Sequence, residues 1–148
     1  MQKNTQYAMQ ERNSIFIIGS GGEIMDWQKG MNNAIGYIEN NLTGTIDFNI
    51  AAKYVGCSTW EFQRIFSFLV HVSLGEYIRQ RKLTLAAHEI QTSDIKIIDI
   101  ALKYGYESPT AFSRAFSKLF GISPSSARGV GVNLNSYPKI TFEFIEKE

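Results

Sequence analysis

Residues 100–128 read IALKYGYESPTAFSRAFSKLFGISPSSAR, and residues 50–78 read IAAKYVGCSTWEFQRIFSFLVHVSLGEYI. At an offset of 50 residues, without a gap, eleven of these 29 positions are identical. Each copy contains an apolar-periodic segment, a glycine, a serine suited to capping a helix, and a second apolar-periodic segment. The repeat therefore predicts two copies of one helix–turn–helix motif, and it pairs Ala51 with Ala101 where we expect the two helices of each motif to cross.

The second helix of each copy is expected to have one buried face and one exposed face. Residues four apart share a face of a helix, so the two phenylalanines of each copy should pack inward together. An arginine falls on the opposite face in both copies. Such an arginine can hold O6 and N7 of guanine with two hydrogen bonds, which is what reading a DNA groove requires. The phenylalanine pairs are Phe62/Phe66 and Phe112/Phe116, and the arginines are Arg64 and Arg114.

Apolar periodicity and capping residues predict an all-α fold with a short C-terminal strand. The two tandem helix–turn–helix subdomains should be joined by a long linker helix. We expect Asp26 to cap the first helix, Ser73 the linker helix, and Ser123 the last short helix, which has Pro124 at its first position. The expected helices cover residues 27–42, 48–55, 58–69, 74–92, 97–104 and 108–120, followed by the short helix after Ser123.

This pattern divides the chain into four segments. Residues 1–24 are expected to be a flexible N-terminal arm with room for one short strand. Residues 25–92 are expected to be the first subdomain with its linker helix, and residues 93–129 the second subdomain. Residues 130–148 form a linker followed by an alternating strand from Ile140 onward. A lone edge strand is not stable. It therefore either begins a further domain of a longer protein or pairs with another segment, such as the apolar residues 15–18.

Composition excludes several functional classes. Hydrophobic residues make up 44% and charged residues 20%, as in globular proteins, and the net charge is +1. Residues 47–128 carry ten basic and seven acidic side chains, which weakly favours a phosphate-binding face. A single cysteine, Cys57, and the dispersed His71 and His88 predict no disulfide, metal site or cofactor. There is no apolar run of membrane-spanning length and no convincing signal peptide, so we expect a cytoplasmic protein.

From about Trp27 to Arg128 the sequence closely resembles the DNA-binding region of the AraC/XylS family of bacterial transcription regulators. The resemblance lies in STWEFQRIF, SLGEYIRQRKLTLAA, IDIALKYGYESPTAFSRAFSKLFGISP and the closing Ser-Ala-Arg. It implies a sequence-specific DNA-binding regulator, most simply an activator, whose second helices enter adjacent major grooves of double-stranded DNA. A linker helix of 19 residues would span about 28 Å, close to the ~34 Å between successive major-groove faces.

The resemblance also implies which residues touch DNA. The first reading helix would present Trp60, Gln63 and Arg64 to the bases, with glutamine suited to adenine and arginine to guanine. The second helix is poorer in polar side chains than in other members, so it should mainly hold the backbone, with Arg114 as its chief base contact. The expected base contacts are Trp60, Gln63, Arg64, Thr110, Ser113 and Arg114. The expected backbone contacts are Ser58, Thr59, Arg79, Lys82, Ser108, Pro109, Lys118 and Arg128.

Further partners and two competing functions complete the sequence-based hypotheses. RNA polymerase is an expected partner, and the C-terminal strand resembles the entry to an effector-binding domain that some family members carry. A helical adaptor that binds a protein without reading DNA is the main alternative. An enzyme is disfavoured, since the sequence shows no paired carboxylates, nucleophile with a base, or phosphate-binding loop.

Overall fold

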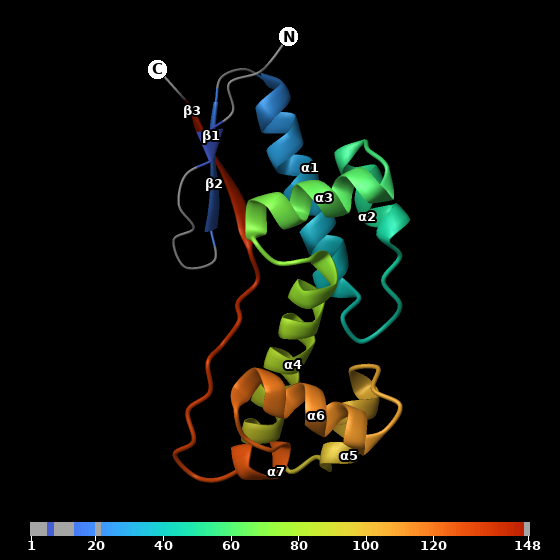
Figure 1. The fold of residues 1–148 in the computed structure, drawn as a ribbon, viewed down its shortest axis with the longest axis vertical. Helices are drawn as coiled ribbons and strands as arrows, with labels where there is room; N and C mark the ends of the chain where they lie inside the picture. The colour runs from blue at the N-terminus through green and yellow to red at the C-terminus, as the bar shows by residue number, and fades with distance from the viewer. Residues whose placement is uncertain (1–5, 8–13, 20–21, 147–148) are drawn as a thin grey trace. The chain divides into compact units, whose positions relative to one another are not determined.

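The computed structural model describes residues 6–7, 14–19 and 22–146 (Figure 1). The chain forms two compact units. The first contains the chain up to Asn41, Ile46–Glu76 and the residues from Lys139 onward, and the second contains Leu42–Thr45 and Tyr77–Pro138. No helix among the described residues is long and apolar enough to cross a membrane.

The first unit combines three helices with a small sheet. Its helices are α1 (Gly22–Asn40), α2 (Phe48–Val55) and α3 (Thr59–Val70). Apolar side chains of α1, spaced at helical intervals, are fully buried at Met31, Ile35 and Ile38. The contact between α1 and α2 requires a glycine at position 30, because a Cβ there would lie 2.5 Å from the carbonyl oxygen of Tyr54. The two helices can therefore approach at backbone distance.

The sheet answers the question of what pairs with the C-terminal strand. Strands β1 (Gln6–Tyr7), β2 (Ser14–Gly19) and β3 (Thr141–Glu146) lie in the order β1-β2-β3. Strand β2 runs antiparallel to β1 and parallel to β3, with Ile15 opposite Phe142. Of the two alternatives for the C-terminal strand, pairing with the apolar segment 15–18 is thus confirmed.

Contacts with α1 hold β3 in place. The side-chain amides of Gln28 and Asn32 donate to the carbonyl oxygen of Phe142 at 3.0 and 2.9 Å, and the Phe142 N–H donates to Oδ1 of Asn32 at 2.8 Å. The Trp27 and Phe142 rings meet edge to face with centroids 6.1 Å apart. One face of α1 therefore bonds to the backbone of β3, and the Trp27 ring on that helix packs against the Phe142 side chain.

The start of α1 differs from the prediction. The helix begins at Gly22, so Asp26 is an exposed residue within the helix and not its N-cap. Residues 6–7, 14–19 and 22–24 of the predicted flexible arm belong to β1, β2 and α1, and the rest of that arm lies outside the described residues. The helix thus begins about one turn earlier than the capping pattern predicts.

The second unit packs three shorter helices against a long one. The long helix is α4 (Leu74–Thr92), and its first three residues belong to the first unit. The shorter helices are α5 (Ile97–Lys103), α6 (Pro109–Phe120) and α7 (Pro124–Ala127). Its buried core joins α4 side chains such as Leu83 and Ile90 to Phe112 and Phe116 of α6. The bounds predicted for α2 to α6 agree with the structure to within one residue, and the predicted caps Ser58, Ser73, Ser108 and Ser123 each accept a backbone hydrogen bond.

After α7 the chain returns along α4. The amide of Gln91 donates to the carbonyl oxygens of Ala127 and Val132 at 3.1 and 2.9 Å. Further along, Arg81 donates to the carbonyl oxygen of Tyr137 at 2.6 Å, and the Tyr137 N–H donates to the Thr84 hydroxyl at 3.2 Å. The connector is therefore fixed to α4 by side-chain to backbone hydrogen bonds.

The two helix–turn–helix motifs, α2–α3 and α5–α6, are related by two different offsets. Their second helices match at 50 residues, since Ser58 and Ser108 are both N-caps. Their first helices match at 49. After each first helix, a backbone hydrogen bond joins residues that are five positions apart. Cys57 N–H donates to the Ala52 carbonyl oxygen at 3.3 Å, and Tyr106 N–H donates to the Ala101 carbonyl oxygen at 3.0 Å. The turn of the second motif is therefore one residue longer.

This longer turn corrects the gapless alignment. Ala101 is equivalent to Ala52, and Ala51 is equivalent to Ile100, so the predicted pairing of Ala51 with Ala101 is wrong. Burial supports the correction, because Ile50 is 40% exposed and Ile100 is 1% exposed. Tyr54 and Tyr104, also identical in the gapless alignment, are 49% and 5% exposed. The identities within the first helices do not mark equivalent positions.

Candidate nucleic-acid interface

Local capping and two buried rings set the orientation of α3. The Ser58 hydroxyl accepts from the Glu61 N–H at 3.1 Å, and Oε1 of Glu61 accepts from the Ser58 N–H and hydroxyl at 3.4 and 3.0 Å. This reciprocal arrangement is a capping box. Phe62 and Phe66 are fully buried. Because they define the inner face, positions on the other side of α3 face outward.

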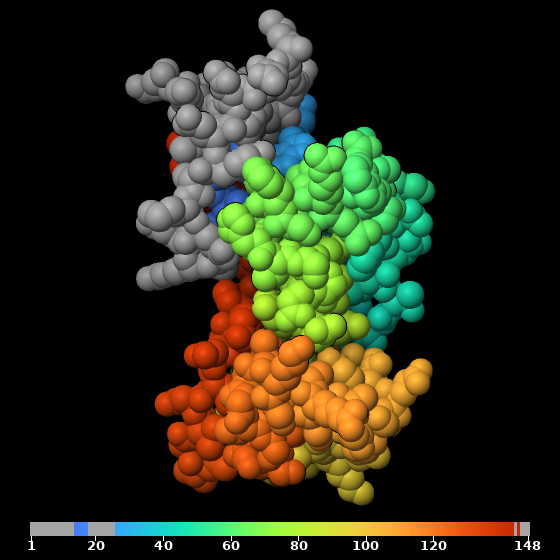
Figure 2. Space-filling view, viewed as in Figure 1, coloured from blue at the N-terminus to red at the C-terminus, as the bar shows by residue number. Residues whose placement is uncertain are grey.

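The outer face of α3 carries a stacked aromatic–cation pair. Trp60 is 66% exposed, and the guanidinium carbon of Arg64 lies 5.2 Å from the centroid of its ring. Arg64 is exposed and Gln63 is half-buried. Figure 2 shows side chains of α3, in light green, forming part of the molecular surface. The three predicted base-reading residues of the first motif therefore lie on one accessible helix, where the Trp60 ring can restrict the movement of the arginine.

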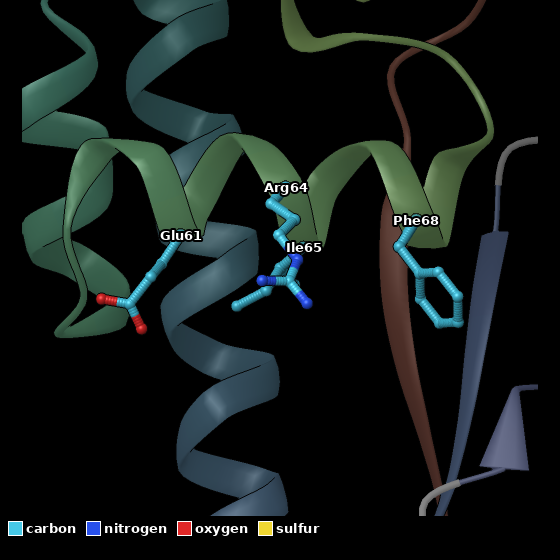
Figure 3. Close-up of a pocket in the computed structure, with 4 residues that line it drawn as sticks. All are labelled: Glu61, Arg64, Ile65 and Phe68. Atoms are coloured by element: carbon cyan, nitrogen blue, oxygen red, sulfur yellow. The ribbon is translucent and has the colours of Figure 1, made fainter.

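Beside this face lies a hollow that sequence reasoning missed. This hollow, which we call the α3 hollow, is lined by Glu61, Arg64, Ile65 and Phe68. Figure 3 shows the four side chains on one side of the helix, with Arg64 between Glu61 and Phe68. Phe68 is 63% exposed. The repeat could have signalled it, because position 68 matches Lys118 of the second copy and so belongs to the exposed face.

The second motif brings four of its predicted contact residues together in one hollow. Ser108 caps α6 by accepting from the Ala111 N–H at 3.1 Å, and Pro109 occupies the first turn. A hollow on the surface of α6 is lined by four of the predicted contact residues and by one serine that was not predicted. They are Pro109, Thr110, Ser113 and Arg114, and then Ser117. Arg114 is exposed, as its equivalent Arg64 is.

The predicted backbone contacts fall into two groups. Arg79 and Lys118 are exposed. Lys82 is half-buried, and burial lowers the pKa of its ammonium group. The Arg128 guanidinium donates to the carbonyl oxygens of Ile90, at 3.0 Å, and of Ile95, so it satisfies backbone groups in and after the last turns of α4. Arg128 thus has an internal structural role that its sequence position did not predict.

The two small polar residues at the start of α3 are also engaged within the protein. The Ser58 hydroxyl belongs to the capping box, and the Thr59 hydroxyl donates to Oδ1 of Asn49 in α2. The latter bond links the two helices of the first motif. Any contact of this helix start with a phosphate would therefore rely chiefly on backbone N–H groups and the positive end of the helix dipole.

The part of the chain that the structure describes contains no group of three or more histidine, cysteine or acidic residues arranged to hold a metal ion. The thiol of Cys57 lies in the turn between α2 and α3. Burial, and then the nearby Glu61 carboxylate, raise its pKa, which disfavours the reactive thiolate. What the surface offers is a set of hydrogen-bonding and stacking groups on α3 and α6.

Comparison with known proteins gives this surface a context. A family model described as a helix-turn-helix domain matches residues 51–129. The chain is 40% identical over 104 residues to the regulatory protein SoxS of Escherichia coli K12, covering 70% of this chain and 97% of SoxS. It is 44% identical over 92 residues to the transcriptional activator AarP of Providencia stuartii, covering 62% of this chain and 68% of AarP.

A solved structure agrees with these matches. A transcriptional regulator from Chromobacterium violaceum with an AraC-type DNA-binding domain aligns with a TM-score of 0.63 and 26% identity, covering 68% of this chain and 90% of that one. The adaptor alternative, which required a protein without DNA binding, is set aside on these matches. The chain belongs to the AraC/XylS family and is a DNA-binding transcription regulator.

Proposed function

We propose that this regulator reads a specific DNA sequence by inserting α3 and α6 into major grooves of one duplex, and that it activates transcription. The observation that carries the proposal is the pair of exposed arginines, Arg64 and Arg114, at equivalent positions opposite buried phenylalanines. AarP, a relative of this chain, is a transcriptional activator. The function is one of binding, with no catalytic step.

The first motif supplies most of the base recognition in this proposal. Arg64, held over the Trp60 ring, donates to guanine, and Gln63 binds adenine. Trp60 itself packs on sugar or on a thymine methyl group. The second motif contributes Arg114 as its main base contact, with Thr110 and Ser113 beside it in the α6 hollow.

The backbone contacts support this reading without adding sequence information. The N-terminal ends of α3 and α6, capped by Ser58 and Ser108 and followed by Thr59 and Pro109, face phosphates. Arg79 and Lys118 supply exposed positive charge. We assign Arg128 and Lys82 to stabilising the second unit, because Arg128 is bonded to backbone carbonyls and Lys82 is half-buried.

The test is selection of bound duplexes from a random pool with the wild-type chain, followed by affinity measurements with Arg64→Ala. We expect Arg64→Ala to lose ~1–3 kcal/mol on the selected site and to relax the preference at one base pair. Lys118→Ala is the matched control, and should weaken selected and random DNA alike. If Arg64→Ala binds the selected DNA and the random DNA as tightly as the wild type does, the proposed reading is wrong.

The remaining partners are proposals of the same kind. We infer that RNA polymerase is the protein partner, since activation requires its recruitment. We also propose a small-molecule effector, but β3 pairs with β2 in the first unit, so we assign no effector domain to this strand. In vitro transcription from the selected site with purified polymerase tests the polymerase proposal. If the Arg64→Ala variant does not stimulate transcription, the stimulation depends on DNA binding.

A further inference from the structure

The α3 hollow contains an apolar side chain where a DNA-reading helix usually carries polar ones. Phe68 lies one turn after Arg64 and is 63% exposed. Half-buried Ile65 and Arg64 line the same hollow, and Figure 3 shows Ile65 next to Arg64. One arginine thus belongs both to the stacked pair with Trp60 and to an apolar recess. The hollow continues the surface that the proposed function places in the groove.

The second copy shows that this feature is specific to the first motif. Position 68 corresponds to Lys118, position 65 to Ala115, and position 61 to Ala111. A lysine at the edge of a reading helix suits a phosphate. In α3 the arginine lies between a glutamate and a phenylalanine, and neither suits a phosphate. Phosphates repel the carboxylate, and the ring gains little from contact with them. The α3 hollow therefore fits base edges better than the DNA backbone.

Base edges offer one apolar group in the major groove, the C5 methyl of thymine. Phe68 and Ile65 supply the apolar wall that such a methyl group needs, and Arg64 beside them supplies donors for guanine. We propose that the α3 hollow receives a thymine methyl next to the base pair read by Arg64, which makes Phe68 a specificity-determining residue. The proposal rests on the proposed function and names a further base that the first motif reads.

The experiment uses the selected duplex with single thymines replaced by deoxyuridine, which removes only the methyl group. At one thymine within the half-site read by α3, we expect wild-type binding to weaken about fourfold, which corresponds to the ~0.8 kcal/mol of one buried methyl. Phe68→Ala should lose a similar factor on the thymine duplex and become indifferent to deoxyuridine. Phe68→Lys, which copies the second motif, should also be indifferent and should show a steeper salt dependence, by about 0.9 in the logarithmic slope.

The outcomes separate this inference from the proposed function. If Arg64→Ala weakens binding but no deoxyuridine substitution affects the wild type, the hollow does not read a methyl group and only this inference fails. If Phe68→Ala keeps the wild-type response to deoxyuridine, Phe68 is not the reader. If Phe68→Ala binds and discriminates like wild type but no longer stimulates transcription, the hollow contacts a protein. Thermal unfolding of each variant checks that the exposed substitution leaves the fold intact.

Discussion

The two helix–turn–helix motifs agree on their buried side and differ on their exposed side. Both second helices begin at a serine cap and bury two phenylalanines four residues apart. Outside, α3 presents a tryptophan stacked with an arginine, and α6 presents an arginine among small side chains. Packing restricts which residues can occupy the buried positions of a duplicated motif. The exposed positions are not restricted in this way and can differ between the two copies. We therefore expect the first motif to make more of the base contacts.

The same comparison shows that identity and equivalence are separate matters. The first helices share four identities at an offset of 50, yet their hydrogen bonds and burial match at 49. The added residue lies in the turn, between Gly105 and Ser108, where the first motif has only Cys57 between Gly56 and Ser58. Turns tolerate such changes because they are at the surface. A gapless repeat must therefore be tested against caps and hydrogen bonds.

Truncating a buried ring should give the largest effect and should be similar in both motifs. Phe112→Ala removes a fully buried side chain from the core of the second unit. We expect a loss of ~3–5 kcal/mol in the free energy of unfolding, measured by urea denaturation. Phe62→Ala should cost about as much in the first unit. Hydrogen exchange should localise each loss to its own unit, and a small change for either variant would contradict the shared role of the rings.

Arg128→Ala should come next, and it separates a structural arginine from a DNA-binding one. Removing the guanidinium leaves the carbonyl oxygens of Ile90 and Ile95 without their donor. The bond to Ile90 is partly buried, and a lost bond of this kind costs ~1–3 kcal/mol where water cannot replace it, so we expect a loss in that range chiefly from this bond. The salt dependence of DNA binding should stay unchanged. A shallower salt slope with unchanged stability would instead show a phosphate contact.

The serine caps allow a finer comparison. Ser58→Ala and Ser108→Ala each remove the acceptor for one backbone N–H, and each should cost ~1 kcal/mol in the free energy of unfolding. Ser58→Ala should cost slightly more, because Glu61 also loses its bond from the Ser58 hydroxyl, which has no counterpart at Ala111. The Ser→Thr variants, which keep the hydroxyl, are the controls. Equal losses would mean that the capping box adds nothing.

Local signals explain which parts of the fold could be predicted. Helices α3, α4, α6 and α7 follow from their serine caps, and α2 and α5 follow from apolar spacing. The outward arginines follow from the phenylalanines on the opposite face. The docking of β3 on α1 could not be predicted, because Gln28 and Asn32 bond to Phe142, more than 100 positions away in the chain. The structural bonds of Arg128 could not be predicted for the same reason, since they are tertiary, and its contact with DNA stays a prediction. Phe68 was overlooked because an apolar residue on a helix is ordinarily assigned to the core.

The smallest expected effect concerns the end of the reading helices. The C-cap residue after α3 is His71, with φ +66°, and the C-cap residue after α6 is Gly121, with φ +78°. The two copies therefore place different residues in the same left-handed conformation. A side chain is disfavoured there and glycine is not. His71→Gly should therefore stabilise the first unit by up to ~1 kcal/mol, and Gly121→His should destabilise the second by a similar amount. Thermal unfolding of both variants measures this. A destabilising His71→Gly would show that the imidazole makes contacts outweighing its backbone strain, and that the two helix ends differ in more than their residue type.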